Sequence, residues 1–273
     1  MRIIAKQWFR NKANNMHLPR KRFGQHFLSD QSVVQHIVSV LAPEPNQHLV
    51  EIGPGQGALT VPVIKLCQQL EVVELDRDLI PEITSRAPRG TDLIVHEADA
   101  LKFDFGSLKQ DARMLRVFGN LPYNISTPLI FHLLSFSDIV SDMVFMLQRE
   151  VALRLAANPG SHDYGRLSVM TQYQCRVELL FDVPPEAFYP PPKVQSSIVR
   201  LIPHHPYPHI AKQFSQFENI VKLAFGQRRK ALRNSLKQVI SDEVWEKTGI
   251  EKGLRAENLS VADFVALSNA LDS

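Results

Sequence analysis

The sequence is poor in cysteine and has no long apolar run. Cys67 and Cys175 are its only cysteines in 273 residues. They are too few and too far apart for a disulfide framework or a metal site, so we expect a reducing, cytoplasmic location. No apolar run approaches the roughly 18 residues of a membrane helix. The basic N-terminus has no long apolar stretch, so we expect neither a secretory signal nor a membrane contact. The histidines show no metal-ligand spacing, and no metal is expected.

The chain also has little excess of one charge sign, because its basic and acidic residues nearly balance. The formal net charge is +3, and 44% of the residues are apolar, which is enough for a sizeable core. A chain of this length has room for one large domain and a smaller one. We expect a flexible N-terminal arm at 1–20, a main domain at 21–203 and a helical domain at 204–273.

The densest glycine pattern is the most informative stretch. Gly53, Gly55 and Gly57 follow the apolar run 49–52, and an amphipathic segment begins directly after them. This order predicts a buried strand, a tight loop and a helix, with backbone N–H groups that can approach a ligand closely. The spacing differs from the dinucleotide motif G-x-G-x-x-G, and no Lys-Ser/Thr pair follows, which excludes a P-loop. The loop indicates a nucleotide-like ligand; a plain strand-to-helix turn is the alternative.

Acidic residues follow the next two predicted strands. The strand 70–76 ends in Glu74 and Asp76, and the strand 93–95 is followed by Asp99. In a doubly wound sheet the carboxyl ends of such strands lie beside the glycine loop. Either Glu74 or Asp76 can accept hydrogen bonds from both ribose hydroxyls, and we favour Glu74. Asp99 can accept a bond from the exocyclic amine of adenine. Solvated strand ends are the alternative.

The tetrapeptide Asn120-Leu121-Pro122-Tyr123 follows the fourth predicted strand. An aromatic amine such as adenine N6 is a poor nucleophile because its lone pair is delocalised into the ring. Asn120 Oδ1 and a backbone carbonyl of this loop can accept hydrogen bonds from the amine and draw its nitrogen toward tetrahedral geometry. Pro122 stiffens the loop, and the Tyr123 ring can stack on the base. Phe188 is a candidate for the second stacking face, with a position in the core as the alternative.

The chain after residue 208 has a helical pattern. Apolar residues between Phe217 and Val239 predict one stripe, and Arg229, Arg233 and Lys237 fall on the opposite side. A basic helical face of this kind can bind RNA phosphates; a solvated surface is the alternative. A last helix is expected to begin near Ser260.

These motifs together resemble a known family. The chain is similar, from about Lys21 to its C-terminus, to the S-adenosylmethionine-dependent rRNA adenine N6,N6-dimethyltransferases, above all to their bacterial small-subunit branch. The segments that carry the resemblance are 51–57, 74–76, 99–100 and 120–123, supported by 24–28, 183–194 and 227–230.

The resemblance implies an α/β fold: a seven-stranded, mostly parallel Rossmann-like methyltransferase sheet with a reversed edge strand, and a small C-terminal α-helical domain. It implies an enzyme that dimethylates N6 of two adjacent adenosines in the 3′-terminal hairpin loop of 16S rRNA. The cofactor is S-adenosylmethionine, the partner is small-subunit rRNA within a ribosomal particle, and the role is in small-subunit biogenesis. We expect a cytoplasmic monomer.

The resemblance also implies a set of site residues. Catalytic roles are implied for Asn120, Leu121, Pro122, Tyr123 and Phe188; cofactor contacts for His26, Leu28, Gly53, Gly55, Glu74, Asp99 and Asn120; and RNA contacts for Arg228, Arg229, Lys230, Arg233 and Lys237. In the family, asparagine usually stands at the position of His26. An imidazole can still donate one hydrogen bond to the cofactor's carboxylate.

Three other functions fit parts of the pattern. A nicotinamide dehydrogenase can share this fold class, but the glycine spacing and the tetrapeptide at 120–123 argue against it. A non-enzymatic ribosome assembly factor or transcription factor is a second alternative, which the intact tetrapeptide disfavours. A large-subunit rRNA methylase of the antibiotic-resistance type is the nearest enzymatic alternative.

Overall fold

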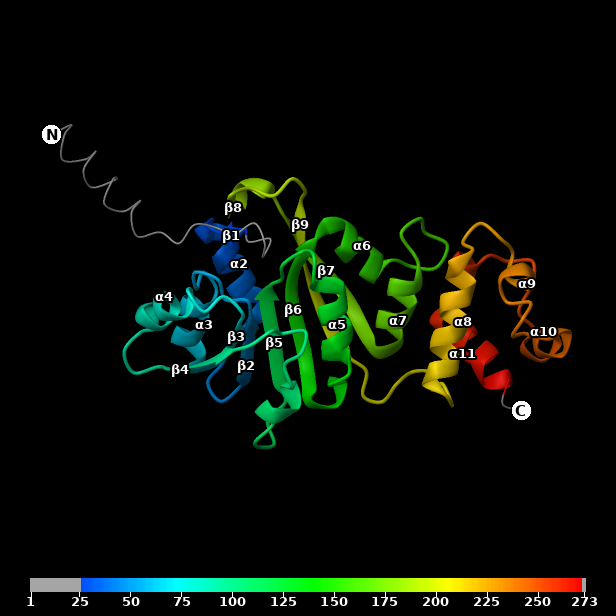
Figure 1. Ribbon diagram of the computed structural model, residues 1–273, viewed down its shortest axis with the longest axis horizontal. Coiled ribbons are helices and arrows are strands. Elements are labelled where there is room, and N and C mark those ends of the chain that lie inside the picture. Colours follow the sequence, from blue (N-terminus) through cyan, green and yellow to red (C-terminus); the bar gives the residue numbers. More distant parts are fainter. Residues whose placement is uncertain (1–25, 272–273) are drawn as a thin grey trace.

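Seven strands form one mixed sheet (Figure 1), seen in a computed structural model that describes residues 26–271. The expected N-terminal arm, residues 1–20, lies outside the described residues. In spatial order the strands are β4 (Asp92–Glu97), β3 (Gln69–Glu74), β2 (His48–Ile52), β5 (Leu115–Asn120), β6 (Val140–Gln148), β9 (Ser196–Pro203) and β7 (Cys175–Val183).

The direction of the strands confirms the predicted α/β sheet, with one difference. The strands from β4 to β6 are parallel, and β9 pairs antiparallel with both β6 and β7. The reversed strand therefore lies second from the edge, and β7 forms the edge itself. A reversed edge strand was expected from the resemblance, whereas the reversed strand observed lies between β6 and β7.

Helices cover both faces of the sheet. On one face α2 (Gln31–Leu41) and α3 (Thr60–Cys67) pack over β2 and β3 in one apolar cluster. On the other face α5 (Ser126–Leu134) and α6 (Arg149–Ala156) belong to a second cluster. Successive residues of a strand point to opposite faces, so Val117 lies in one cluster and Phe118 in the other. The sheet also carries α4 (Ile80–Arg86) and the short 3-10 helices η2 (Phe105–Leu108), η3 (Ser137–Ile139) and η4 (Pro185–Ala187).

Local signals account for the start of α2. The Asp30 carboxylate accepts hydrogen bonds from the backbone N–H groups of Ser32 and Val33, at 2.8 and 3.3 Å, as an N-cap does. Val34, Ile37 and Leu41 share its buried face.

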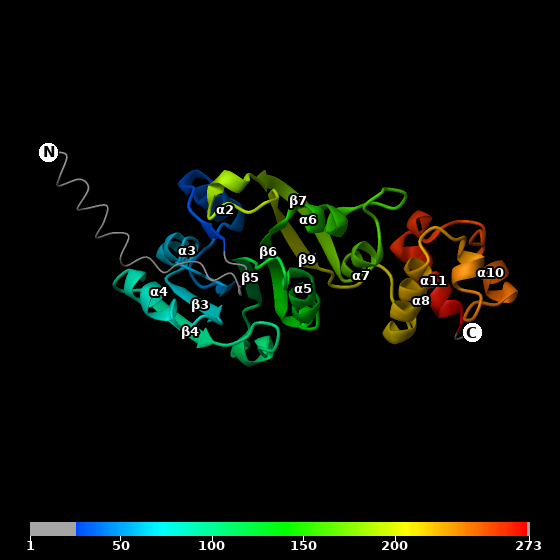
Figure 2. The ribbon, with the colours of Figure 1, turned by 45° about the horizontal axis from the view of Figure 1, so that its top comes forward.

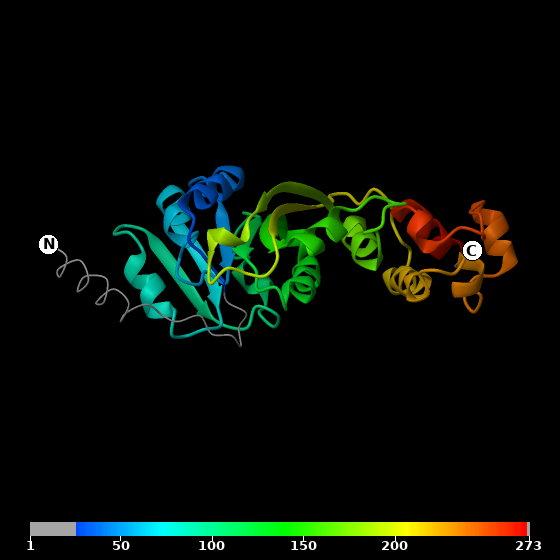
Figure 3. The same ribbon diagram turned by 90° about the horizontal axis from the view of Figure 1, so that it is seen from above.

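The remaining helices form a third cluster at one end of the molecule, on the right in Figures 1 and 3. They are α7 (Arg166–Gln174), α8 (Phe214–Gly226), α9 (Leu232–Ser235), α10 (Asp242–Thr248) and α11 (Val261–Ala270), with the 3-10 helix η5 (Ala256–Asn258). The cluster draws side chains from α7 as well as from the chain after residue 203, and the division into domains at 203/204 stays a prediction. Within residues 26–271, no helix has the length and apolar character to cross a bilayer.

One C-terminal prediction is wrong. The apolar stripe from Phe217 to Val239 does not lie on a single helix, because α8 ends at Gly226 and α9 begins at Leu232. Backbone pairing replaces the helix between them: Ala231 bridges to Arg255, and Leu232 N–H donates to the carbonyl of Leu254 at 2.8 Å. The apolar period continues across this break because both segments pack into the same cluster. The predicted last helix is confirmed as α11, with Ser260 as its N-cap.

A two-stranded sheet joins the beginning of the described chain to the region after β7. β1 (Phe27–Leu28) pairs antiparallel with β8 (Phe188–Tyr189). Ser29 N–H extends the contact by donating to the carbonyl of Ala187 at 2.8 Å. Figure 2 shows the β8 segment, in yellow-green, beside α2 in blue. This pairing places His26 and Pro190 at the edge of the main sheet where the strands end.

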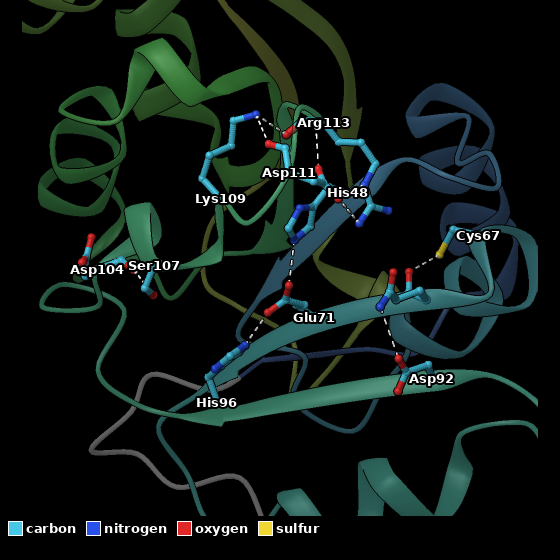
Figure 4. Close-up of polar contacts among 11 residues, drawn as sticks. His48, Cys67, Glu71, Asp92, His96, Asp104, Ser107, Lys109, Asp111 and Arg113 are labelled. Carbon is cyan, nitrogen blue, oxygen red and sulfur yellow. Dashed lines mark hydrogen bonds and ion pairs between the residues drawn. The ribbon is translucent and has the colours of Figure 1, made fainter.

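A polar cluster crosses three strands on one face of the sheet (Figure 4). The Glu71 carboxylate accepts hydrogen bonds from His48 Nε2 at 2.7 Å and from His96 Nε2 at 2.5 Å. Burial acts to raise the pKa of Glu71, but the hydrogen bonds and charges of the two histidines outweigh it, and the pKa lies below its usual range. Among residues 26–271, no group of three or more His, Cys, Asp or Glu side chains, this cluster included, is arranged to hold a metal ion.

Candidate active site

A cavity of about 300 Å³ lies at the carboxyl ends of β2, β3, β4 and β5. This is where ligands bind in open α/β sheets. The structure brings ten of the predicted site residues to its wall; their roles stay predictions. They are His26, Leu28, Gly53, Gly55, Glu74, Asp99, Asn120, Leu121, Pro122 and Tyr123.

The glycine loop forms the floor of the cavity. Gly53 and Gly55 have φ values of 65° and 57°, in the left-handed region that side chains disfavour. A Cβ on Gly55 would lie 3.2 Å from the ring of Phe27, so glycine also allows β1 to close over the loop. The loop is tightly turned and lies against Phe27. Its glycines have no side chains, so its backbone is open to a ligand in the cavity.

Glu74 holds the glycine loop from the end of β3. Its carboxylate accepts hydrogen bonds from Gly55 N–H at 3.2 Å and from Asp76 N–H at 2.8 Å. Burial raises the pKa of Glu74, and these two hydrogen bonds oppose the rise. Asp76, the alternative ribose contact, is 3% exposed, below the 6% of Glu74. Both residues line the cavity, and Glu74 also holds the glycine loop through its bond from Gly55 N–H.

Glu51 is a buried acid that the sequence reasoning missed. It lines the cavity with 2% of its surface exposed, and Thr60 Oγ1 donates to its Oε2 at 2.6 Å. Burial raises its pKa to about 8; the charge of Glu74 adds to the rise and the bond from Thr60 opposes it. Glu51 is thus largely protonated at neutral pH. A lone acid within the buried run 49–52 was the available signal.

Asn120 is oriented by a hydrogen bond to a residue far from it in the sequence. Its Nδ2 donates to the backbone carbonyl of His26 at 3.0 Å. This bond turns Oδ1 the other way, and within residues 26–271 no group donates to Oδ1. The carbonyl of Leu121 also accepts no hydrogen bond from this part of the chain, whereas that of Pro122 accepts from Ile125 N–H at 3.1 Å. The loop therefore presents two free acceptor oxygens side by side in sequence, from Asn120 and Leu121.

Tyr123 and His26 form an aromatic wall beside these acceptors. Their rings are stacked with centroids 5.8 Å apart. The Tyr123 hydroxyl shares a 2.7 Å hydrogen bond with Oγ of Ser196, a fully buried residue at the start of β9 that sequence reasoning missed. His26 Nδ1 donates to the carbonyl of Pro190 at 2.7 Å. A neutral His26 therefore has no second N–H, and only its protonated form can donate to a cofactor carboxylate.

Phe188 is the predicted catalytic residue that the structure does not place at the cavity. Its side chain is 3% exposed and packs in the cluster beneath α2, with Leu28 directly opposite across β1 and β8. The core position, weighed as the alternative, is the one observed. A stacking role for Phe188 would require its ring to leave this cluster.

The predicted RNA contacts lie at the opposite end of the molecule. Arg228, Arg229, Lys230, Arg233 and Lys237 are all exposed. Because α8 ends at Gly226, the four-residue spacing from Arg229 to Lys237 does not define a helical face. Arg228 is engaged within the chain: it pairs with Glu257 at 3.0 Å and bonds to the carbonyl of His162. The other four cations project from the turn between α8 and α9 and from α9 onward.

Comparison with known proteins is consistent across sequence and structure. The family described as "Ribosomal RNA adenine dimethylase" matches residues 16–273. A relative named "Ribosomal RNA small subunit methyltransferase A" from Saccharophagus degradans is 55% identical over 255 residues, which cover 93% of this chain and 95% of the relative. A relative of the same name from Chromohalobacter salexigens is 56% identical over 257 residues, covering 93% and 91%.

Solved structures resemble the chain over most of its length. A dimethyladenosine transferase from Plasmodium falciparum has a TM-score of 0.76 at 28% identity, covering 89% of this chain and 96% of its own. The 23S rRNA methyltransferase ErmE has a TM-score of 0.72 at 22% identity, covering 90% and 100%, which indicates a shared fold.

Proposed function

The chain belongs to the ribosomal RNA adenine dimethylase family, and from this premise we propose that it dimethylates N6 of two adjacent adenosines in the 3′-terminal hairpin loop of 16S rRNA. Its relatives at 55–56% identity are named as small-subunit rRNA methyltransferases, which favours the small subunit over the large one. The substrate is the rRNA within a ribosomal particle. The chain acts as a cytoplasmic monomer, and its two buried, free cysteines fit a reducing compartment.

The observation that carries this proposal is the orientation of Asn120. Its Nδ2 is held by the His26 carbonyl, so its Oδ1 remains an acceptor, beside the carbonyl of Leu121, which accepts no hydrogen bond from residues 26–271. An exocyclic NH2 group has two N–H bonds to donate, one for each oxygen. Two acceptors fixed in this way withdraw the amine lone pair from the ring and favour its attack on an electrophile. The adenosine has to leave its stack to reach them.

The residues around the cavity fit S-adenosylmethionine. Gly53 and Gly55 expose backbone to a ligand, and Glu74 and Asp99 supply carboxylate acceptors for ribose hydroxyls and for the adenine amine. The uncharged form of Glu51 avoids a third negative charge beside these two. When bound, S-adenosylmethionine supplies a methyl group on an electrophilic sulfonium. The chain contributes the binding, the two acceptors and a stacking surface on Tyr123; no general base is needed before transfer.

The test of this function is methylation mapping. Purified protein is incubated with S-adenosylmethionine and small-subunit particles that lack the modification, and methylated adenosines are located in the rRNA. We expect dimethylation of two adjacent adenosines by the wild type and none by Asn120→Ala, whose affinity for S-adenosylhomocysteine stays within a few-fold. Asn219→Ala, an exposed asparagine on α8, is the matched control and stays active. Methylation of large-subunit rRNA instead, or normal turnover by Asn120→Ala, would contradict the proposal.

The exposed cations are proposed to hold the rRNA through its phosphates. The triple variant Arg229→Ala, Arg233→Ala and Lys237→Ala should bind particles more weakly, and the slope of log K against log salt should fall by roughly 2 to 3. Its affinity for S-adenosylhomocysteine should not change, because these residues lie outside the cavity wall. An unchanged slope would leave them as a solvated surface.

A further inference from the structure

Tyr189 is an exposed aromatic residue whose ring has no aromatic partner among residues 26–271. Its side chain is 62% exposed, and within residues 26–271 the only other aromatic residue among the exposed large apolar side chains is Phe214, at 44%. Phe214 is explained by its ring contacts with Tyr173 and Phe217. Tyr189 has no ring contact with any described residue. Its π-face is therefore open to a planar group from outside the described part of the chain.

The register of the small sheet places this ring beside the cavity. Tyr189 lies directly opposite Phe27 in the antiparallel pair of β1 and β8. Side chains opposite one another in such a pair lie on the same face, with Cβ atoms about 5 Å apart. Phe27 lines the cavity and faces Gly55. The other pair, Leu28 and Phe188, packs in the core cluster, and of these two only Leu28 also reaches the cavity wall. Tyr189 therefore stands at the rim of the cavity, outside its wall.

Cations and acids lie around Tyr189 in equal number, so the exposed ring, and not a net positive charge, is the feature that suits an unpaired nucleobase. Lys193 is exposed four residues further along the same loop. Arg149 donates its backbone N–H to the carbonyl of Gln195 at 2.9 Å, which brings a second cation to the base of the loop, where it pairs with Asp182. Asp182 and Glu186 are both exposed on the approach to the loop. Aromatic rings interleaved with cations are the surface on which single-stranded nucleic acids stack their bases.

We propose that Tyr189 is a stacking platform for an unpaired nucleobase next to the adenosine that enters the cavity. The inference rests on the proposed function, because it takes rRNA as the substrate. It assigns the outer face of the rim to RNA, while Tyr123 inside the wall meets the target base. Stacking is tolerant of base identity because every base has a π-face, so this contact orients the strand and does not read its sequence.

The test separates stacking from general apolar contact. Single-turnover methylation of small-subunit particles is measured against particle concentration for Tyr189→Ala, Tyr189→Leu, Tyr189→Phe and Tyr189→Trp. Leucine keeps apolar area without a π-face, and phenylalanine removes only the hydroxyl. We expect alanine and leucine to raise the half-saturating particle concentration by roughly 5-fold to 100-fold, as loss of one stacked base does, and phenylalanine and tryptophan to leave it near the wild-type value. Ile210→Ala, at a 69% exposed site outside the cavity wall, is the control and changes nothing.

A second readout identifies the partner. A photoreactive benzoylphenylalanine in place of Tyr189 should cross-link to rRNA beside the methylated adenosines. Full activity of Tyr189→Ala, rescue by leucine, or cross-links only to ribosomal protein would each overturn the inference while leaving the methyltransferase function intact. Failure of the wild type to methylate particles would instead overturn the proposed function and, with it, this inference.

Discussion

Gly119→Ala is expected to damage both the fold and the site through one close contact. Gly119 lies on β5, beside β2 in the centre of the parallel sheet. A Cβ at this position would lie 2.3 Å from the carbonyl oxygen of Ile52, although real Cβ contacts essentially never fall below 3.0 Å. The neighbour is backbone in a buried ladder, so β2 and β5 have to separate. Overpacking of this kind costs about 3 kcal/mol.

The same separation disturbs the cavity from two sides. Ile52 immediately precedes Gly53 of the glycine loop, and Gly119 immediately precedes Asn120. A loss of about 3 kcal/mol corresponds to a fall in melting temperature of roughly 6–12 °C for a chain near this size. We also expect the affinity for S-adenosylhomocysteine to fall at least roughly tenfold, equivalent to about 1.4 kcal/mol.

The assay is thermal unfolding with and without S-adenosylhomocysteine, beside calorimetric titration. Gly226→Ala is the matched control, because an added Cβ there meets nothing within 4 Å at the end of α8. Alanine favours helix over glycine, so this control should be neutral or stabilised by up to about 1 kcal/mol. A Gly119→Ala protein that melts and binds like the wild type would refute the argument that the β2–β5 spacing determines the site.

Three further predictions follow from the carboxylates and from Tyr123. Glu74→Ala should weaken S-adenosylhomocysteine binding by about 1.5–3 kcal/mol, as loss of hydrogen bonds to a charged acceptor does; unchanged affinity in calorimetry would shift the ribose contact to Asp76. Glu51 retains its proton when folded, up to a pKa of about 8 against 4.5 for the free residue. The contribution of this proton to the free energy of unfolding is therefore complete below about pH 4.5 and is lost as the pH rises toward 8. Urea titrations should show the stability of Glu51→Gln rising relative to that of the wild type by about 1 kcal/mol per pH unit in this window. Parallel stability-versus-pH profiles for the two proteins would contradict this. Tyr123→Phe and Ser196→Ala remove the same hydrogen bond, so their effects on the single-turnover rate should not add in the double variant, and full additivity would show that Ser196 does not act through Tyr123.

The parts of the site that the sequence predicted are those built from local signals. The apolar runs before Gly53, Glu74 and Asn120 predicted strands because buried parallel strands are continuously apolar. Once the strands alternate with helices, their carboxyl ends share one edge, and this placed Glu74, Asp99 and Asn120 near one another without any side-chain information. The structure shows them lining one cavity.

The parts that were missed depend on contacts between distant segments. β1 and β8 are only two residues long each and are 160 residues apart in sequence, too short for a period-two pattern to reveal. Without that pairing, Phe188 was a candidate for stacking and Tyr189 was not considered, although the register turns the first into the core and the second to the rim. The helix break after Gly226 was hidden because the apolar residues on both sides enter one cluster.

The loop 120–123, which we propose to be catalytic, is oriented by three contacts with segments far from it in the sequence. The β2–β5 ladder sets the distance from Gly53 to Asn120. The carbonyl of His26, held in place by the pairing of β1 with β8, turns the amide of Asn120, and Ser196 at the start of β9 fixes the hydroxyl of Tyr123. Each support comes from a different segment, so loss of the contact with His26 or with Ser196 leaves the loop in place but frees a single group to rotate. Changes that disturb the β1–β8 pairing, Ser196 or Gly119 should therefore impair distinct steps: presentation of the acceptor, stacking of the base, and spacing between cofactor and amine. If Pro122 alone held the loop as one rigid unit, each of these changes would instead impair all three steps together.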